Sequence, residues 1–469
     1  MSENQWRIDL ARVLRPYGFI GITPETGSMV PGSFDLRRVN VENFLAADRL
    51  DVAFLSHSEN SSLCGQKFAA EAGGQLIFDT QKKALFKRPL FRPLEPFISL
   101  APSAELTPLV TTQSGRIVIA WRKVGARRQL VCGFDPVSQF QRYTHGNPAR
   151  QGTNVQKNLW GPVGQEQPAY LYQGNVMPGY ESIPWADRLG EWLTKKLSAH
   201  AHIPRLWPLP DRAKGVVLLT GDDDQAQLEK YARQQELLEG FPITYFMMDC
   251  TNHTPQTLAE LSPTTEFGVH IDALDRPDAY VEACAEQIPP IRELLRGHDV
   301  FAIRNHGHLN SGYWGHLTAW KDFGLWFDLN IRGLDGTCPT GSLLPFSVSA
   351  HATEWGAHLS LFSTFSDTMG PYQGMTEGQQ VSLVRRIARQ VERDVPGILV
   401  CNFHPQNVAT VEKVHRAVME IGRRSAWRAY GVTTFAKFLK SFWNARLVQE
   451  DNGFRVAGLN AGSGVCVVS

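Results

Sequence analysis

The strongest constraint on the fold is a repeated alternation of short apolar runs and helical patterns between positions 215 and 403. The apolar runs, each too short for a solitary helix, begin at Gly215, Ile243, Glu266, Val300 and Gly397. Such runs are typical of strands buried on both faces. Amphipathic patterns separate them, and Thr376-Glu-Gly-Gln matches a capping box at the start of one. Strand then helix, repeated, predicts a parallel sheet or barrel whose functional site lies at the carboxyl ends of its strands.

The rest of the chain suggests two further parts. Residues 1–205 also alternate apolar runs with helical patterns, which predicts a separate α/β layer. Three prolines at 204–210 should hold the backbone extended and indicate a boundary, so that residues 206–445 form a second domain. Residues 446–469 are polar and contain glycines, and they are expected to form a small β appendage or a tail.

Composition and charge limit the classes of partner that the chain is expected to bind. The 469 residues hold 47 Lys plus Arg against 46 Asp plus Glu, a formal net charge of +1, so no nucleic acid partner is indicated. No signal-peptide pattern opens the chain and no window approaches about 18 apolar residues, so we expect a cytoplasmic protein without membrane insertion. The 7 cysteines form no C-x-x-C pair, which argues against a disulfide framework or a thiolate zinc site. Oligomeric state is not predicted.

Polar residues follow four of the predicted strands at the point where each strand ends. They are the acidic run 222–224, His270, the Arg304-Asn-His-Gly-His segment and His404. Because the carboxyl ends of parallel strands meet at one edge of a sheet, we expect these groups to converge. Such a set of acids, histidines and a cation is what a hydrolase site requires.

Each of these groups can be explained by a structural role or by a role in catalysis or metal binding. Neighbouring carboxylates at Asp222 and Asp223 repel, and a bound cation is one way to keep both ionised, whereas Asp224 favours a helix cap. Two histidines and one carboxylate leave an open position for water on a zinc-like ion, and His306 is the preferred ligand of its segment. His404 suits protonation of a leaving amine.

With these residues in view, positions 212–445 resemble the NodB-homology polysaccharide deacetylases, which are like carbohydrate esterase family 4. Thr220-Gly-Asp-Asp-Asp matches the first motif of that family, Thr-Phe-Asp-Asp-Gly, which implies that Asp222 is the catalytic base and Asp223 a metal ligand. Glu266-Phe-Gly-Val-His is similar to the second motif and assigns His270 to the metal. The resemblance implies a distorted (β/α) barrel of the NodB type.

The second motif is incomplete, because Leu274 stands where the family has another histidine. We interpret His306 as a relocated ligand, with His308 and Asp272 as the alternatives. The expected metal ligands are then Asp223, His270 and His306. Zinc is the preferred metal, with cobalt, nickel or manganese as alternatives.

The remaining motifs supply the rest of the implied machinery. Arg304 is expected to orient the base Asp222, and the segment ending at His404 resembles the last motif, which makes His404 the general acid. Asn402 replaces an apolar residue that usually lines the pocket for the acetyl methyl group, so the acyl group stays open.

The N-terminal part is more weakly similar to the class I glutamine amidotransferase-like α/β fold. That similarity implies a flavodoxin-like parallel sheet for residues 1–205. Catalysis there would need a cysteine on a sharp elbow, and Ser62-Leu-Cys64-Gly does not match one. We therefore interpret Cys64 as structural and this domain as non-catalytic.

These observations together predict a metal-dependent hydrolase that removes an N-acetyl group from a carbohydrate or sugar derivative, in carbohydrate metabolism or glycan biosynthesis. One alternative is a metal-independent amidohydrolase of a small amide, like the allantoin-type relatives of the family. Another is a degenerate domain without catalysis that binds glycans through Tyr313, Trp314 and Trp320, although packing of these aromatics in a loop is favoured over that role.

Overall fold

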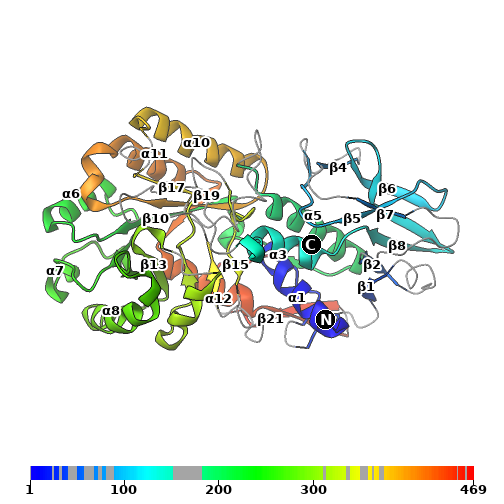
Figure 1. Cartoon of the computed structure of the whole chain (residues 1–469), viewed down its shortest axis with the longest axis horizontal. Coiled ribbons are helices and arrows are strands. Elements are labelled where there is room, and N and C mark those ends of the chain that lie inside the picture. The colour runs from blue at the N-terminus through cyan, green and yellow to red at the C-terminus, as the bar shows by residue number, and fades with distance from the viewer. Residues whose placement is uncertain are drawn as a thin grey trace.

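The computed structural model of the chain forms two sheets with helices between and around them (Figure 1). It describes residues 2–23, 26–30, 34–40, 50–56, 68–71, 76–80, 89–150, 182–309, 313–333, 338–348, 358–361, 364–368, 374–451, 453–459 and 462–468. Cys64 and positions 151–181 lie outside these ranges.

The C-terminal part is built on a 10-stranded sheet. Its strands are β10 (Gly215–Asp222), β11 (Ile243–Met247), β12 (Thr265–Ile271), β13 (Ala302–Asn305), β14 (Phe327–Asp328), β15 (Phe346–Ser347), β16 (Leu359–Ser360), β17 (Phe365–Ser366), β18 (Gly397–Asn402) and β19 (Trp427–Tyr430). The order is β15-β16-β14-β13-β12-β11-β10-β18-β17, with β19 also beside β10. Every pairing except β15 with β16 is parallel, which confirms the predicted parallel sheet.

Helices follow these strands in the alternation that the sequence predicts. They are α6 (Leu228–Leu238), α7 (Pro255–Ala259), α8 (Tyr280–Leu294), α10 (Glu377–Arg393), α11 (Glu412–Gly422) and α12 (Val432–Asn444). The predicted capping box is present at the start of α10, where the Thr376 and Gln379 side chains cap each other's backbone N–H. Figure 1 shows α6, α7, α8, α10 and α11 on the outside of this sheet.

The N-terminal part contains a mixed sheet, so the predicted flavodoxin-like parallel sheet is wrong over the described residues. Its strands are β1 (Leu36–Val39), β2 (Val52–Leu55), β3 (Phe68–Glu71), β4 (Ile77–Asp79), β5 (Phe97–Leu100), β6 (Leu106–Thr112), β7 (Ile117–Val124) and β8 (Arg127–Cys132). Among these, β1 with β2 and β2 with β8 are parallel, and the remaining pairings are antiparallel. The physical reason is visible at β7 and β8, because Gly125 and Ala126 join them directly and leave no room for a crossover helix.

Helices of the N-terminal part lie between the two sheets in Figure 1. They are α1 (Glu3–Leu14), α3 (Pro136–Thr144) and α5 (Trp185–Ala201). One hydrophobic cluster contains Leu10 and Trp185 from this part together with Val216 and Phe435 from the other, so the boundary near 205 does not separate two cores. Short 3-10 helices occur at Arg15–Tyr17, Pro148–Arg150, Pro210–Arg212, Pro277–Ala279, His306–His308, Gly315–Phe323 and Pro405–Thr410.

The last residues add strands to both parts. A hairpin forms from β20 (Arg446–Glu450) and β21 (Gly453–Ala457), and β22 (Val467–Val468) pairs antiparallel with β9 (Arg205–Leu206). Within the portion of the chain that the structure describes, no helix combines the length and the apolar character that crossing a membrane requires.

Arg15 joins the N-terminal helix to the last helix of the large sheet. Its side chain is buried, and Nη2 donates to the carbonyl oxygens of Phe442 at 2.6 Å, Trp443 at 3.0 Å and Ala445 at 2.5 Å. These carbonyls belong to the C-terminal end of α12, where the helix dipole favours a cation. A single guanidinium therefore fixes α1 against α12.

We expect Arg15→Met to lower the free energy of unfolding by about 2–3 kcal/mol, because buried carbonyls lose charge-assisted hydrogen bonds. Urea denaturation followed by fluorescence measures the change. Arg296→Met is the control, since the Arg296 side chain is 77% exposed and its ion-pair partner among the described residues, Glu293, is 66% exposed. Equal unfolding midpoints for the two variants would show that the Arg15 contacts do not stabilise the fold.

Candidate active site

The site lies at the carboxyl ends of four strands of the large sheet, among which β11 also lies. Asp222 ends β10, His270 lies near the end of β12, Arg304 lies on β13, and His404 follows β18. A Cβ at Gly221 would lie 2.6 Å from the carbonyl oxygen of Phe403, so glycine is what allows β10 and β18 to approach here. The predicted convergence of strand-end residues therefore has a local cause in the sequence.

Asp222 is held from two sides. Arg304 Nη1 donates to its Oδ1 at 2.8 Å, and Asn402 Nδ2 donates to its Oδ2 at 2.7 Å. Arg304 also donates to Thr220 Oγ1 at 2.9 Å. Burial alone would raise the pKa of Asp222, but the nearby charges of Arg304, His270 and His404 lower it well below its usual range. Asp222 is therefore a carboxylate at neutral pH, and Asn402 holds this carboxylate in place.

His404 faces Asp222 and is oriented by a residue that the sequence analysis missed. Asp367 Oδ1 lies 2.7 Å from His404 Nδ1, and Asp367 Oδ2 accepts the His404 backbone N–H at 2.7 Å. This turns Nε2 toward Asp222 Oδ2 at 3.7 Å and Asp224 Oδ2 at 3.4 Å. Burial opposes the charged ring, but Asp367, Asp224 and Asp222 raise the pKa of His404 to about 10. The imidazole is thus set up as a proton donor.

Asp224 points into the site, although the sequence analysis favoured a helix cap for it. That cap is wrong, because α6 begins at Leu228 and its N-cap residue is Gln227. Asp224 Oδ1 lies 3.1 Å from His270 Nε2 and 3.7 Å from His306 Nε2. Burial raises the pKa of Asp224, but the hydrogen bond to His270 and the charges of His404 and His270 lower it below its ordinary value.

Asp223 is oriented differently from its neighbours. Tyr231 donates its hydroxyl to Asp223 Oδ1 at 2.5 Å, and Thr251 donates to the same oxygen at 3.0 Å. Oδ2 is buried and has no hydrogen-bond partner among the described residues. Burial raises the pKa of Asp223 despite the two hydroxyls. The structure thus does not place this carboxylate in contact with His270 or His306, with which the sequence analysis grouped it.

His270 and His306 each turn Nδ1 toward an oxygen atom of another residue and Nε2 toward Asp224. His270 Nδ1 lies 2.9 Å from the Arg304 carbonyl oxygen, which only accepts, so Nδ1 carries the hydrogen. His306 Nδ1 lies 3.1 Å from Asp272 Oδ2, an ion-pair contact without the geometry of a hydrogen bond. The Nε2 atoms of both rings face Asp224, which is the orientation expected of ligating histidines.

The other candidates for the missing histidine ligand lie elsewhere. His308 is buried, its Nδ1 lies 3.0 Å from the Asn330 carbonyl oxygen, and burial together with Arg304 lowers its pKa to about 3. Asp272 faces His306 rather than Asp224. Of the three candidates, His306 is the one in contact with Asp224.

The aromatics of the glycan-binding alternative are mostly inside the protein. Trp314 is 2% exposed and Trp320 is 0% exposed. Their indole N–H groups donate to the His145 carbonyl and to the Tyr280 hydroxyl, and Tyr313 is half-buried beside them. Two of the three rings therefore pack in the core and offer no surface to a sugar.

The donors around Asp224 have the composition of a hydrolytic metal site, with one carboxylate and two imidazoles. Ligands bound at 2.0–2.1 Å lie roughly 3–3.5 Å from one another, close to the 3.1 and 3.7 Å measured from Asp224 Oδ1 to the two imidazoles. Over the described ranges, however, no group of three or more His, Cys, Asp or Glu side chains is arranged to hold an ion. The donor chemistry fits a divalent metal, and the coordination geometry is not preformed.

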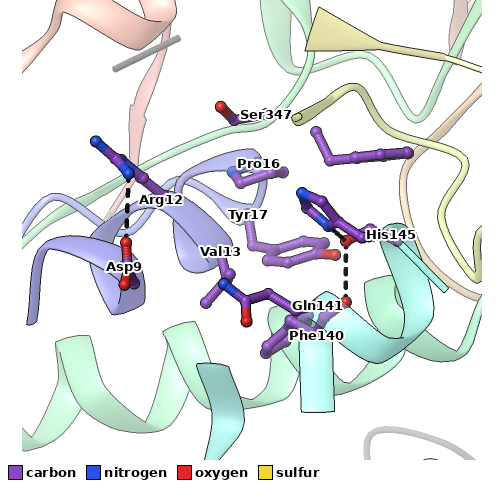
Figure 2. Close-up of a pocket in the computed structure, with 11 residues that line it drawn as sticks. Asp9, Arg12, Val13, Pro16, Tyr17, Phe140, Gln141, His145 and Ser347 are labelled. Atoms are coloured by element: carbon purple, nitrogen blue, oxygen red, sulfur yellow. Dashed lines mark hydrogen bonds and ion pairs between the residues drawn. The ribbon is translucent and has the colours of Figure 1, made fainter. Parts of the chain in front are cut away.

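A cavity of about 100 Å³ lies between α1, α3 and β15 (Figure 2). Its lining includes Arg12 and His145, and none of the strand-end residues described above. Arg12 Nη1 lies 3.3 Å from Asp9 Oδ1, and Thr144 Oγ1 lies 2.8 Å from His145 Nδ1. The polar groups of this cavity are thus paired with each other, and it is separate from the candidate active site.

Solved structures are similar to about half of the chain. A protein described as a polysaccharide deacetylase, from Mycobacterium smegmatis, is 16% identical and covers 50% of this chain and 92% of its own length, with a TM-score of 0.39. Another, described as involved in O-antigen biosynthesis in Bordetella bronchiseptica, is 20% identical, with coverages of 48% and 89% and a TM-score of 0.31. An allantoinase is 14% identical, with coverages of 49% and 91% and a TM-score of 0.37.

No protein-family profile matches the chain, and no curated protein matches it. Two of the similar solved structures are described as polysaccharide deacetylases, and each covers about half of the chain. All of these likenesses are distant, so the chemistry of the site rests on its own contacts.

We expect His404 in metal-free protein to stay protonated well above neutral pH and to titrate with a pKa of about 10. An unfolded histidine titrates near about 6.5. The charged ring therefore contributes to stability fully below about pH 6.5, and this contribution is lost as the pH rises through the folded value. NMR of the labelled imidazole measures the titration, with His404→Gln to assign the signal. Asp367→Asn should lower the pKa, and a wild-type value near that of free histidine would refute the assignment.

Proposed function

We propose that the chain is a hydrolase that removes an N-acyl group, first of all an N-acetyl group, from an amino sugar or related carbohydrate. The observation that carries the proposal is the placement of Asp222 and His404. The Asp222 carboxylate and the His404 imidazole lie 3.7 Å apart at the ends of neighbouring strands. Arg304 and Asn402 hold the carboxylate, and Asp367 holds the imidazole. Such a pair supplies the base and the acid of amide hydrolysis.

The two residues take successive steps. Asp222 accepts a proton from a water molecule as the water oxygen attacks the amide carbonyl carbon, which gives a tetrahedral intermediate. His404 then donates its Nε2 proton to the amide nitrogen, the carbon–nitrogen bond breaks, and a carboxylic acid and an amine leave. Arg304 keeps Asp222 ionised and aimed. Asp367, which accepts the Nδ1–H of His404, favours the doubly protonated ring, so that Nε2 also carries a proton to donate.

A divalent metal belongs to this proposal, with zinc first and cobalt, nickel or manganese as alternatives. Asp224, His270 and His306 would hold it, so that Asp224 replaces the Asp223 of the sequence prediction. Asp224 Oδ1 lies within 3.7 Å of Nε2 of both histidines, which supports this choice. When bound, such an ion polarises the carbonyl and lowers the pKa of water.

A second candidate function is a metal-independent amidohydrolase of a small amide. One observation favours it: within the described residues, no three ligand-type side chains already form a coordination group. In that case Asp222 and His404 act alone, and Asp224 pairs electrostatically with the surrounding histidines. The substrate would then be a small linear or cyclic amide.

Acetate release from N-acetylglucosamine oligomers and N-acetyl sugar nucleotides tests the reaction class, with ring opening of allantoin followed separately as the comparison amide hydrolysis. We expect Asp222→Asn and His404→Gln each to lower kcat by about 100-fold or more, because each removes a proton-transfer group. His298→Gln is the control, since His298 is exposed and its ring contact is with Phe267. Turnover of an N-acetyl sugar that survives both active-site variants would refute the assigned roles.

Elemental analysis of protein purified without chelator tests the metal set. We expect about one metal per chain in the wild type, with loss of the metal in Asp224→Asn and His306→Ala. Asp249→Asn should retain it, because Asp249 is an exposed carboxylate in a nearby turn. Full metal content in Asp224→Asn would exclude the proposed ligand, and a wild type that takes up no zinc, cobalt or manganese would favour the metal-independent candidate.

A further inference from the structure

The turn after β10 carries Asp224 into the site on a strained backbone. Asp224 has a φ of 41° and Gln225 a φ of 55°, the left-handed region that costs free energy for residues with a Cβ. Two successive positive φ values are the pattern of a type I′ turn, in which Gly, Asn and Asp are favoured. Because the second position holds Gln225, which is none of these, contacts outside the turn are needed to stabilise it.

Asp223, the residue before the turn, makes contacts of this kind. Its backbone N–H donates to the Phe246 carbonyl at 3.0 Å, and its own carbonyl accepts the Ala226 N–H at 2.7 Å, which closes the turn. Its buried carboxylate accepts the hydroxyls of Tyr231, on α6, and of Thr251, which follows β11. Asp223 is therefore tied by both its backbone and its side chain to the elements on either side of the turn.

The segment after β11 also holds the outer side of the turn. Asn252 Nδ2 donates to the Gln225 carbonyl at 2.8 Å and lies 3.3 Å from the Ala226 carbonyl. Gln225 Nε2 lies 3.2 Å from Cys250 Sγ. Residues after β11 thus hold the Gln225 side of the turn, while Asp224 faces the active site.

We propose that Asp223 is a positioning residue, which acts through Tyr231 and Thr251 to hold the turn so that Asp224 faces His270 and His404. This inference rests on the proposed function, since Asp224 and His404 belong to that machinery. The Asp224 carboxylate lies 3.1 Å from His270 Nε2 and 3.4 Å from His404 Nε2, distances that a small shift of the turn would lengthen beyond contact. A displacement of about 1 Å at an active site costs about 100-fold in rate.

A matched pair of tyrosine variants tests the proposal. Tyr231→Phe removes the hydroxyl that binds Asp223, whereas Tyr245→Phe removes a neighbouring buried hydroxyl that donates to Gln234 at 2.9 Å. We expect Tyr231→Phe to lower kcat for an N-acetyl sugar by about 10- to 100-fold with KM little changed. Tyr245→Phe should lower Tm by a similar amount and keep kcat. Equal kcat values for the two variants would overturn the proposal.

A second pair keeps the proposal testable if Tyr231→Phe fails to fold. Thr251→Val removes the other hydroxyl and should lower kcat, and Thr251→Ser retains it and should restore kcat. Hydrogen exchange of a peptide covering 222–228 gives a readout that does not depend on turnover. We expect exchange to be faster in Tyr231→Phe than in Tyr245→Phe, and faster in Thr251→Val than in Thr251→Ser. If the wild type hydrolyses no N-acetyl sugar, the proposed function fails. Hydrogen exchange alone then tests whether Asp223 holds the turn. Unchanged exchange in both variants would show that Asp223 does not hold the turn.

Discussion

The buried ion pair between Arg304 and Asp222 is the constraint on which the rest of the site depends. The residues lie on β13 and β10, which are separated by two strands and would stand roughly 14 Å apart in a flat sheet with a strand spacing of about 4.8 Å. Since side chains leave a sheet nearly perpendicular to it, a contact of 2.8 Å between them requires the sheet to curl. The guanidinium also lies 4.5 Å from the centre of the Phe246 ring, on β11 between the two. Removing either charge would take from the other its buried partner of opposite charge, which is strongly destabilising.

Environment gives chemically identical carboxylates different tasks. Arg304 keeps Asp222 ionised, and Asp367 orients the His404 imidazole. Asp224 lies between the imidazoles of His270 and His404. Asp223, buried against two hydroxyls, has its pKa raised instead. The distribution of acids thus follows from the partner that each strand or turn presents, in line with the three physical causes of pKa shifts.

The parallel sheet and its strand-end residues could be predicted from the sequence, because period and topology together place those residues at one edge. The choice between Asp223 and Asp224 could not, since it depends on the sign of φ in the turn and aspartate is compatible with either sign. Asp367 follows a strand of 2 residues and carried no periodic signal. In the N-terminal part, apolar runs suit parallel and antiparallel strands equally. The Gly125-Ala126 connection was the available sign of a hairpin.

The tie between Arg15 and the end of α12 has a consequence for how the chain is made. Its partners lie 427 to 430 positions later, so during vectorial synthesis α1 leaves the ribosome long before its acceptors exist. The N-terminal sheet has its own local hairpins and can begin to form early, whereas the seam between α1 and α12 closes only after nearly the whole chain is released. A polypeptide interrupted before Phe442 would therefore lack the three carbonyl acceptors that this buried cation has in the finished fold.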